Sequence, residues 1–215
     1  MNFIKAANNQ TCALLLIEFQ NEWLSSQGKL YPLFEDKQQV VNSIKNASQV
    51  LAATRLKAMP VIHSGLAYSY KHQELGDIHQ GVFSAIKSKQ TFLVNEVGSQ
   101  FAEPFAPKPG EFIVSGRVGT SAFTGSNLDN YLRNNRIHKL FIMGYALHVC
   151  VESTLRAAHD LGYETIVIED ACACFTFEQR DYVLKNVIHH FGVSMKTQDY
   201  IKQLNYEVIT YENNG

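Results

Sequence analysis

The sequence predicts an α/β fold in which a central, mainly parallel sheet of about six strands lies between two layers of helices. Two observations carry this prediction. Short apolar runs alternate with helical patterns along the chain, which is the order that β-α-β crossovers produce in a parallel sheet covered on both faces. The length of 215 residues, with 46% hydrophobic residues, also fits one domain with its own core. We therefore expect a single domain over residues 1–215.

The first half of the chain supplies three of the expected strands. Residues 13–17 are a continuous apolar run, which is typical of a strand that is buried on both faces. Residues 37–58 place their apolar side chains on one helical stripe. Residues 60–63 and 112–114 are the next two apolar runs, and we predict a strand at each.

The second half repeats the alternation. Apolar residues spaced four, three and three apart from Val151 to Leu161 predict a helix, and Gly162 is placed to end it as a C-cap. The remaining predicted elements are strands at 139–143, 165–168 and 193–195 and a helix at 177–191.

Residues 64–110 interrupt the alternation of predicted strands and helices. The segment is too long for a simple connection, so we expect it to form a lid over the site or an arm that contacts another copy of the chain. Its apolar residues Val82, Phe83, Phe92 and Leu93 look exposed. We therefore expect a homodimer or a higher homo-oligomer.

Charge and composition exclude several classes of partner. With a formal net charge of −1, the chain lacks the excess of basic residues that is typical of proteins that bind nucleic acid or an anionic membrane. No apolar stretch reaches eighteen residues, and the first ten residues lack the apolar core of a secretory signal. The four cysteines, at positions 12, 150, 172 and 174, fit reduced thiols in a cytoplasmic protein.

Three chemically capable side chains each follow a predicted strand. They are Glu18, Arg117 and Cys150, and the carboxyl ends of parallel strands meet at one edge of a sheet. Cys150 lies in the first turn of a predicted helix, where free N–H groups and the helix dipole favour a thiolate and can bind an oxyanion. Taken singly, each residue also fits a structural role: a solvated glutamate, a surface arginine and a small buried thiol.

Together these segments resemble the isochorismatase-like (cysteine hydrolase) superfamily. The family's Asp-x-Gln-Asn motif is matched by Glu18-Phe19-Gln20-Asn21, and its Lys before Ser-Ala-Phe is matched by Arg117 before Ser121-Ala122-Phe123. Its glycine-to-cysteine signature is matched by Gly144, Cys150 and Val151. Gly162-Tyr163 and Asp170-Ala171 continue the match, which covers roughly residues 11–200.

The resemblance implies a three-layer αβα, Rossmann-like fold and a set of roles. Cys150 would be the nucleophile, Glu18 the acid/base that takes the thiol proton, and Arg117 the neighbouring cation. A cis peptide bond would join Tyr145 and Ala146, and the N–H groups of Ala146 and Cys150 would form the oxyanion hole.

Three positions depart from the family pattern. Glu18 replaces aspartate, Arg117 replaces lysine, and Leu147 replaces a threonine beside the pocket. Arginine can pair bidentately with a carboxylate. The two charged exchanges could compensate each other as a longer acid–cation pair, or they could hold Glu18 in a salt bridge and disable the site.

We expect no cofactor and no metal. The Asp-x-His with which nicotinamidases of this family hold a metal is absent after the second strand, and His63, His72 and His79 have no metal-ligand spacing. Aromatic and neighbouring residues are the candidates for contact with a small-molecule substrate. They are Trp23, Phe123, Tyr145, Leu147 and His148, with Tyr68, Tyr70 and Phe175 as further aromatics.

The leading functional hypothesis is hydrolysis of a C–N bond in a small amide-type substrate through a Cys150 thioester. An isochorismatase-type hydrolysis of a vinyl ether, which uses the acid directly, is the alternative within the family. A catalytically silent member that serves binding or assembly is the alternative outside catalysis.

Overall fold

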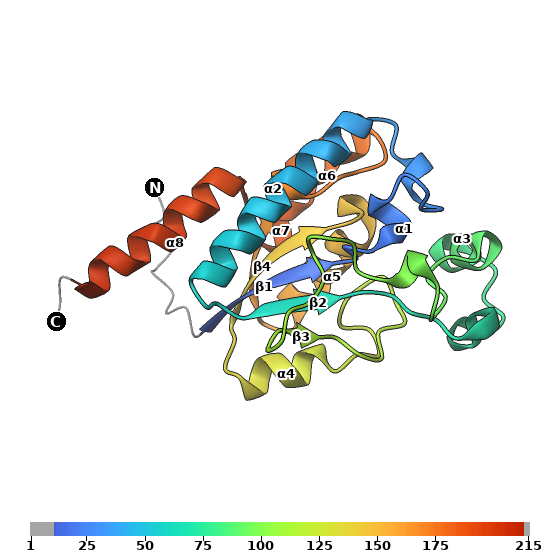
Figure 1. The fold of residues 1–215 in the computed structure, drawn as a ribbon, viewed down its shortest axis with the longest axis horizontal. Coiled ribbons are helices and arrows are strands. Elements are labelled where there is room, and N and C mark those ends of the chain that lie inside the picture. The colour runs from blue at the N-terminus through green and yellow to red at the C-terminus, as the bar shows by residue number, and fades with distance from the viewer. Residues whose placement is uncertain (1–10, 213–215) are drawn as a thin grey trace.

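Six parallel strands form one sheet in the order β3-β2-β1-β4-β5-β6 (Figure 1). We describe the protein from a computed structural model, which covers the backbone of residues 11–212 and the side chains of residues 11–205. The N-terminal segment that we interpret as lacking a signal lies outside these residues. The strands are β1 (Cys12–Ile17), β2 (Val61–Ser64), β3 (Phe112–Ile113), β4 (Lys139–Gly144), β5 (Glu164–Ile168) and β6 (Val193–Met195). The predicted α/β fold is confirmed, and every strand pair is parallel.

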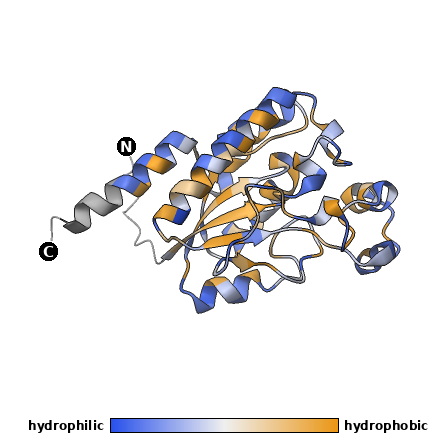
Figure 2. Cartoon of the chain, in the orientation of Figure 1, coloured by the Kyte–Doolittle hydropathy of each residue, from blue (hydrophilic) through white to orange (hydrophobic). Residues whose placement is uncertain are grey.

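The two central strands, β1 and β4, are buried along their whole length. They pair in register from Cys12 opposite Lys139 to Ile17 opposite Gly144. Figure 2 shows these strands as the apolar centre of the molecule. Because a continuous apolar run suits a strand covered on both faces, the sequence located both strands closely.

Helices cover both faces of the sheet, and aromatic contacts fasten them to it. Tyr200 of α8 (Thr197–Glu212) packs edge-on against Phe141 of β4 with ring centroids 4.9 Å apart, and its hydroxyl lies 2.7 Å from Thr54 of α2 (Lys37–Leu56). Tyr131 of α4 (Leu128–Asn134) stacks on Phe112 of β3 at 3.7 Å. Among the described residues, no helix combines the length and the apolar character needed to cross a bilayer.

Two predicted helices differ in detail from the structure. The helix expected over residues 177–191 is divided at Val187 into α6 (Phe177–Asn186) and α7 (Ile188–Phe191). The helix after β4 begins with a π-helical turn over Leu147–Val151 and continues as α5 (Glu152–Asp160). Gly162 follows it with a φ of +89°, as a C-cap glycine does.

Ser64 ends β2, and residues 65–110 contain no strand of the sheet. This segment folds into a turn of 3-10 helix over Tyr70–Leu75, α3 (Gly81–Lys89) and a second 3-10 turn over Val97–Ser99. Figure 1 shows α3 beyond the carboxyl ends of the strands, on the same side as α1 (Asn21–Leu24). The expectation that Phe92 is exposed is wrong, because its side chain is 1% exposed. Association of the chain into a homo-oligomer stays a prediction.

Candidate active site

Glu18 lies directly after β1 and is completely buried. Its φ of +56° is unusual for a residue with a side chain. The backbone is held in this conformation by the Glu18 amide, which donates to the Ser64 carbonyl at the end of β2 with an N–O distance of 2.8 Å. A strained backbone conformation that is fixed by its neighbours is a feature of functional sites, and here it accompanies a buried carboxylate at the carboxyl end of the sheet.

Arg117 follows β3 and is 4% exposed. Its Nη2 donates to Glu18 Oε1 at 2.5 Å and to the Thr120 carbonyl at 2.7 Å. Its Nε donates to the Gly119 carbonyl at 3.1 Å, and Nη1 lies 3.3 Å from the Ser64 carbonyl. The guanidinium therefore meets the carboxylate through one nitrogen and not bidentately, because main-chain oxygens occupy its other donors.

The turn that carries Cys150 depends on a close approach between β4 and β1. A Cβ atom on Gly144 would lie 2.2 Å from the Ile17 carbonyl oxygen, so only glycine fits there. The next peptide bond, Tyr145–Ala146, is cis, as the resemblance implies. The Ala146 carbonyl then accepts hydrogen bonds from the amides of Val149 and Val151, at 3.1 and 3.3 Å, which closes the turn around Cys150.

Both charged side chains act on the Cys150 thiol, which is 3% exposed. Burial raises the pKa of Cys150 well above its ordinary value, and the negative charge of Glu18 raises it further. The positive charge of Arg117 opposes these effects and is outweighed. The sequence suggested a thiolate favoured by a helix N-terminus. The structure instead favours the neutral thiol, because the loss of solvent and the adjacent carboxylate raise its pKa.

A cavity of about 110 Å³ opens onto Glu18 and Cys150. Apart from these two residues and the indole N–H of Trp23, its lining is apolar. The other lining residues are Trp23, Leu30, Leu33, Leu66, Val82, Ala85, Ile86, Phe92, Val149 and Phe175. The cavity therefore joins the carboxylate and the thiol to a small apolar chamber.

Trp23 and Phe175 are the two aromatic candidates from the sequence that line this cavity. The Trp23 indole also donates from Nε1 to Glu18 Oε2 at 2.8 Å. His148 packs edge-on against Phe175, with ring centroids 4.5 Å apart, and burial lowers the pKa of His148 to about 4. It is therefore neutral at physiological pH.

The other candidates are engaged elsewhere. Tyr145 is fully buried, with its hydroxyl 2.9 Å from Ser43 of α2, and Leu147 is 1% exposed in the core. Phe123 stacks on Tyr163, with ring centroids 5.8 Å apart. Tyr68 donates to the Val118 carbonyl at 2.9 Å, and Tyr70 is 73% exposed.

The lining residues that sequence reasoning missed come mainly from the 64–110 segment. Leu66, Val82, Ala85, Ile86 and Phe92 all belong to it. One signal was available: positions 82, 85 and 86 have the spacing that places side chains on one helical face. That spacing indicates a buried face but not what the face covers.

Of the three histidines considered as metal ligands, His63 and His72 make separate contacts, and His79 is exposed. His63 Nε2 lies 2.8 Å from Glu111 Oε2, and His72 Nε2 lies 2.8 Å from the Thr91 carbonyl. Within the part of the chain that the structure describes, no three His, Cys, Asp or Glu side chains are grouped to hold a metal ion.

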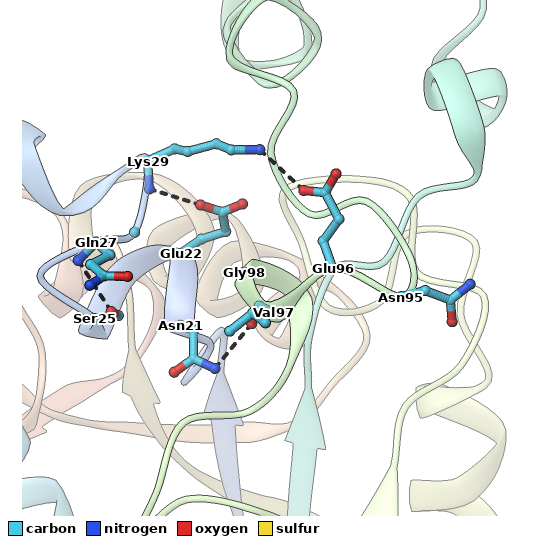
Figure 3. Close-up of a pocket in the computed structure, with 10 residues that line it drawn as sticks. Asn21, Glu22, Ser25, Gln27, Lys29, Asn95, Glu96, Val97 and Gly98 are labelled. Atoms are coloured by element: carbon cyan, nitrogen blue, oxygen red, sulfur yellow. Dashed lines mark hydrogen bonds and ion pairs between the residues drawn. The ribbon is translucent and has the colours of Figure 1, made fainter.

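A larger and more open pocket, of about 430 Å³, lies beside α1 (Figure 3). It is separate from the cavity of Cys150. The buried Glu22 carboxylate accepts the Lys29 amide at 2.9 Å, and Lys29 Nζ pairs with Glu96 at 3.2 Å. A Cβ on Gly98 would lie 2.2 Å from Glu22 Oε1. The polar groups of this pocket therefore serve to join α1 to the loop over residues 95–99.

Comparison with known proteins gives one family match and several relatives. The model of the Isochorismatase domain matches residues 12–199. YwoC of Bacillus subtilis, an uncharacterized isochorismatase family protein, is 32% identical over 106 residues, 49% of this chain and 56% of that protein. The ureidoacrylate amidohydrolase RutB of Pseudomonas syringae pv. syringae is 29% identical over 170 residues, 74% of this chain and 69% of that protein.

A solved structure has the same fold. It is a cysteine hydrolase from Pseudomonas syringae pv. phaseolicola, with a TM-score of 0.80 and 19% sequence identity. The superposition covers 94% of this chain and 96% of that one.

Proposed function

Because this chain belongs to the isochorismatase family of hydrolases, we propose that it hydrolyses the C–N bond of a small amide through a thioester on Cys150. The observation that carries the proposal is the meeting of Glu18, Arg117 and Cys150 beyond the carboxyl ends of β1, β3 and β4, with a cavity beside Glu18 and Cys150. The amide-hydrolysing relative RutB supports the choice of a C–N bond.

The neutral thiol implies that proton transfer accompanies attack. Glu18 takes the Cys150 proton as the sulfur bonds to the substrate carbonyl carbon, and it then gives that proton to the departing nitrogen. Loss of ammonia or an amine leaves the acyl group on sulfur. A water molecule, deprotonated by Glu18, attacks the thioester and releases the carboxylic acid, and the proton returns to the thiol.

Arg117 and Trp23 position the acid in this scheme. The guanidinium binds one carboxylate oxygen of Glu18 and the indole binds the other. Two fixed donors limit the rotation of the carboxylate, and such positioning supports proton transfer in a buried site. The N–H groups of Ala146 and Cys150 would bind the oxyanion.

Mass spectrometry of the protein with a panel of small amides tests the proposal. We expect an acyl adduct on Cys150, and we expect Cys150→Ala to lower kcat by a factor of about 10³ or more. Cys174→Ala is the matched control, since this buried thiol does not line the cavity. It should retain activity.

Two results would redirect the assignment. Hydrolysis of a vinyl ether that survives Cys150→Ala, with no turnover of the amides, would favour direct protonation of the vinyl ether by Glu18, which needs no sulfur nucleophile. No turnover, together with alkylation of Cys150 no faster than that of Cys174, would favour a silent member of the family.

A further inference from the structure

The cavity beside Cys150 offers the substrate almost no polar surface. One wall is formed by α3, where Val82, Ala85 and Ile86 have the i, i+3, i+4 spacing of a single helical face. Ile86 is buried, whereas Val82 and Ala85 are also exposed to solvent. Phe92 and Phe175 close the chamber from other segments. The polar groups among the lining side chains are the Glu18 carboxylate, the Cys150 thiol and the Trp23 indole N–H, which already donates to Glu18. The proposed reaction uses the first two.

Arg117, which contacts Glu18, and Lys29, which precedes Leu30 of the lining, are both already engaged. Every nitrogen of Arg117 donates to Glu18 or to the Ser64, Gly119 and Thr120 carbonyls. Lys29 Nζ donates to the Gln90 carbonyl at 2.5 Å and to Glu96 at 3.2 Å. No lysine, arginine or histidine of the described residues lines the cavity.

A second carboxylate inside the chamber would therefore be unpaired and would face Glu18. Burying an unpaired charge is strongly unfavourable, and repulsion between two anions adds to that cost. The chamber thus selects against anionic substrates.

The volume limits the size of the acyl group. A cavity of about 110 Å³ is small, so it accepts only a short acyl group. We expect a branched aliphatic group such as isobutyl to be near the upper limit of size.

We propose that the substrate is an uncharged amide whose acyl chain is short and aliphatic, bound with that chain in the chamber under α3. This inference rests on the proposed amide hydrolysis at Cys150 and names the substrate class. Specificity then comes from apolar burial, which should raise kcat/KM about fourfold for each added methylene until the chamber is full.

A pair of isosteric amides tests the charge argument. 3-Methylbutanamide and malonamate have the same number of non-hydrogen atoms and differ in carrying an isopropyl or a carboxylate group. We expect kcat/KM to be at least about a hundredfold higher for 3-methylbutanamide, because its apolar end needs no cation. The series from acetamide to butanamide should rise, and hexanamide should fall below butanamide.

Substitutions on α3 test whether the acyl chain of the substrate binds beside this helix. Ala85→Leu adds a side chain to the lining and should lower kcat/KM for 3-methylbutanamide at least tenfold while affecting acetamide much less. Ser88→Leu is the matched control, since it adds the same side chain to the same helix at an exposed position outside the lining. It should leave both substrates unchanged.

Binding to Cys150→Ala separates this inference from the proposed function. Saturable binding of 3-methylbutanamide, with malonamate at least tenfold weaker, supports the apolar chamber even if the wild type hydrolyses neither amide, which would refute the proposed function alone. Preference for malonamate in binding or turnover, binding of neither amide, or equal effects of Ala85→Leu and Ser88→Leu would overturn the inference.

Discussion

One additional methylene in Glu18, relative to the aspartate of the family motif, is matched by a larger cation in Arg117. The ion pair is anchored at both ends. Arg117 is fixed by main-chain carbonyls of its own loop, and Glu18 by its amide and by the Trp23 indole. The pair therefore sets where the carboxylate lies relative to the thiol.

The two residues should depend on each other, and a double-mutant cycle tests this. Glu18→Asp shortens the acid while the anchored guanidinium stays in place, and a displacement of about 1 Å can lower the rate on the order of a hundredfold. Arg117→Lys leaves buried carbonyls without donors. We expect each single change to lower the rate of Cys150 acylation or alkylation, and the double change to recover part of the loss.

Either of two outcomes would contradict this account. Wild-type rates in both single variants would mean that neither residue serves the thiol. A double variant far more reactive than the wild type would mean that the natural pair disables the site.

The residues of the candidate site were easier to predict from the sequence than their hydrogen bonds and protonation states. Glu18, Arg117 and Cys150 were found because each follows a strand and parallel strands end at one edge. The Trp23–Glu18 hydrogen bond depends on side-chain conformations that no spacing encodes. The neutral state of Cys150 depends on burial, which outweighs the helix-end effect that the sequence suggested.

At the level of elements, the junction between β4 and α5 depends on Gly144. Its φ of +149° and the contact with the Ile17 carbonyl both exclude a side chain. Gly144→Ala should lower the free energy of unfolding by about 2–4 kcal/mol, since it combines a clash with an unfavourable backbone conformation. Urea denaturation measures this.

Gly162→Ala is the matched control. This glycine also has a positive φ, but a Cβ there would meet no atom within 4 Å. Its cost should be limited to the backbone effect, about 1–2 kcal/mol. Equal losses in the two variants would show that the approach of β4 to β1 does not require glycine.

Strands were easier to predict than the helices and the long connection. Strands such as β1 and β4 are continuous apolar runs, so their burial can be predicted from the sequence. The break at Val187 and the π-helical turn before α5 cannot be predicted from the spacing of apolar residues, because the apolar side chains still fall on one face. The path of residues 64–110 is set by contacts with α1 and the strand ends, which local patterns cannot reveal.

At the level of the whole molecule, one carboxylate joins three distant segments. Glu111 accepts hydrogen bonds from Arg55 of α2 at 2.7 and 3.0 Å and lies 2.8 Å from His63 of β2. The Lys108 amide donates to the same carboxylate. Burial raises the pKa of Glu111, but these hydrogen bonds outweigh it and hold the pKa at about 2.

The low pKa predicts how stability depends on pH. The unfolded chain binds a proton at Glu111 near 4.5 and the folded protein only near 2, so the contribution is complete above pH 4.5 and is lost as pH falls toward 2. Glu111→Gln should lower the free energy of unfolding at pH 7 by about 2 kcal/mol and flatten its fall between pH 5 and 3.

Denaturation at a series of pH values checks this expectation. Glu96→Gln is the control, because Glu96 belongs to an ion pair with Lys29 in which both side chains are more than 40% exposed. Exposed pairs contribute little, so its curve should follow the wild type. An unchanged slope below pH 5 in Glu111→Gln would refute the role of Glu111.

The strand order also has a consequence for the ribosome-bound nascent chain. β1 pairs with β4, whose first residue comes 122 residues after the last residue of β1. At a synthesis rate of 5–20 residues per second, β4 is made on the order of ten seconds after β1. During that time the edge of β1 that pairs with β4 stays unpaired. Unpaired apolar strands are prone to aggregate, so the interval before residue 144 is translated is when this chain most needs a chaperone.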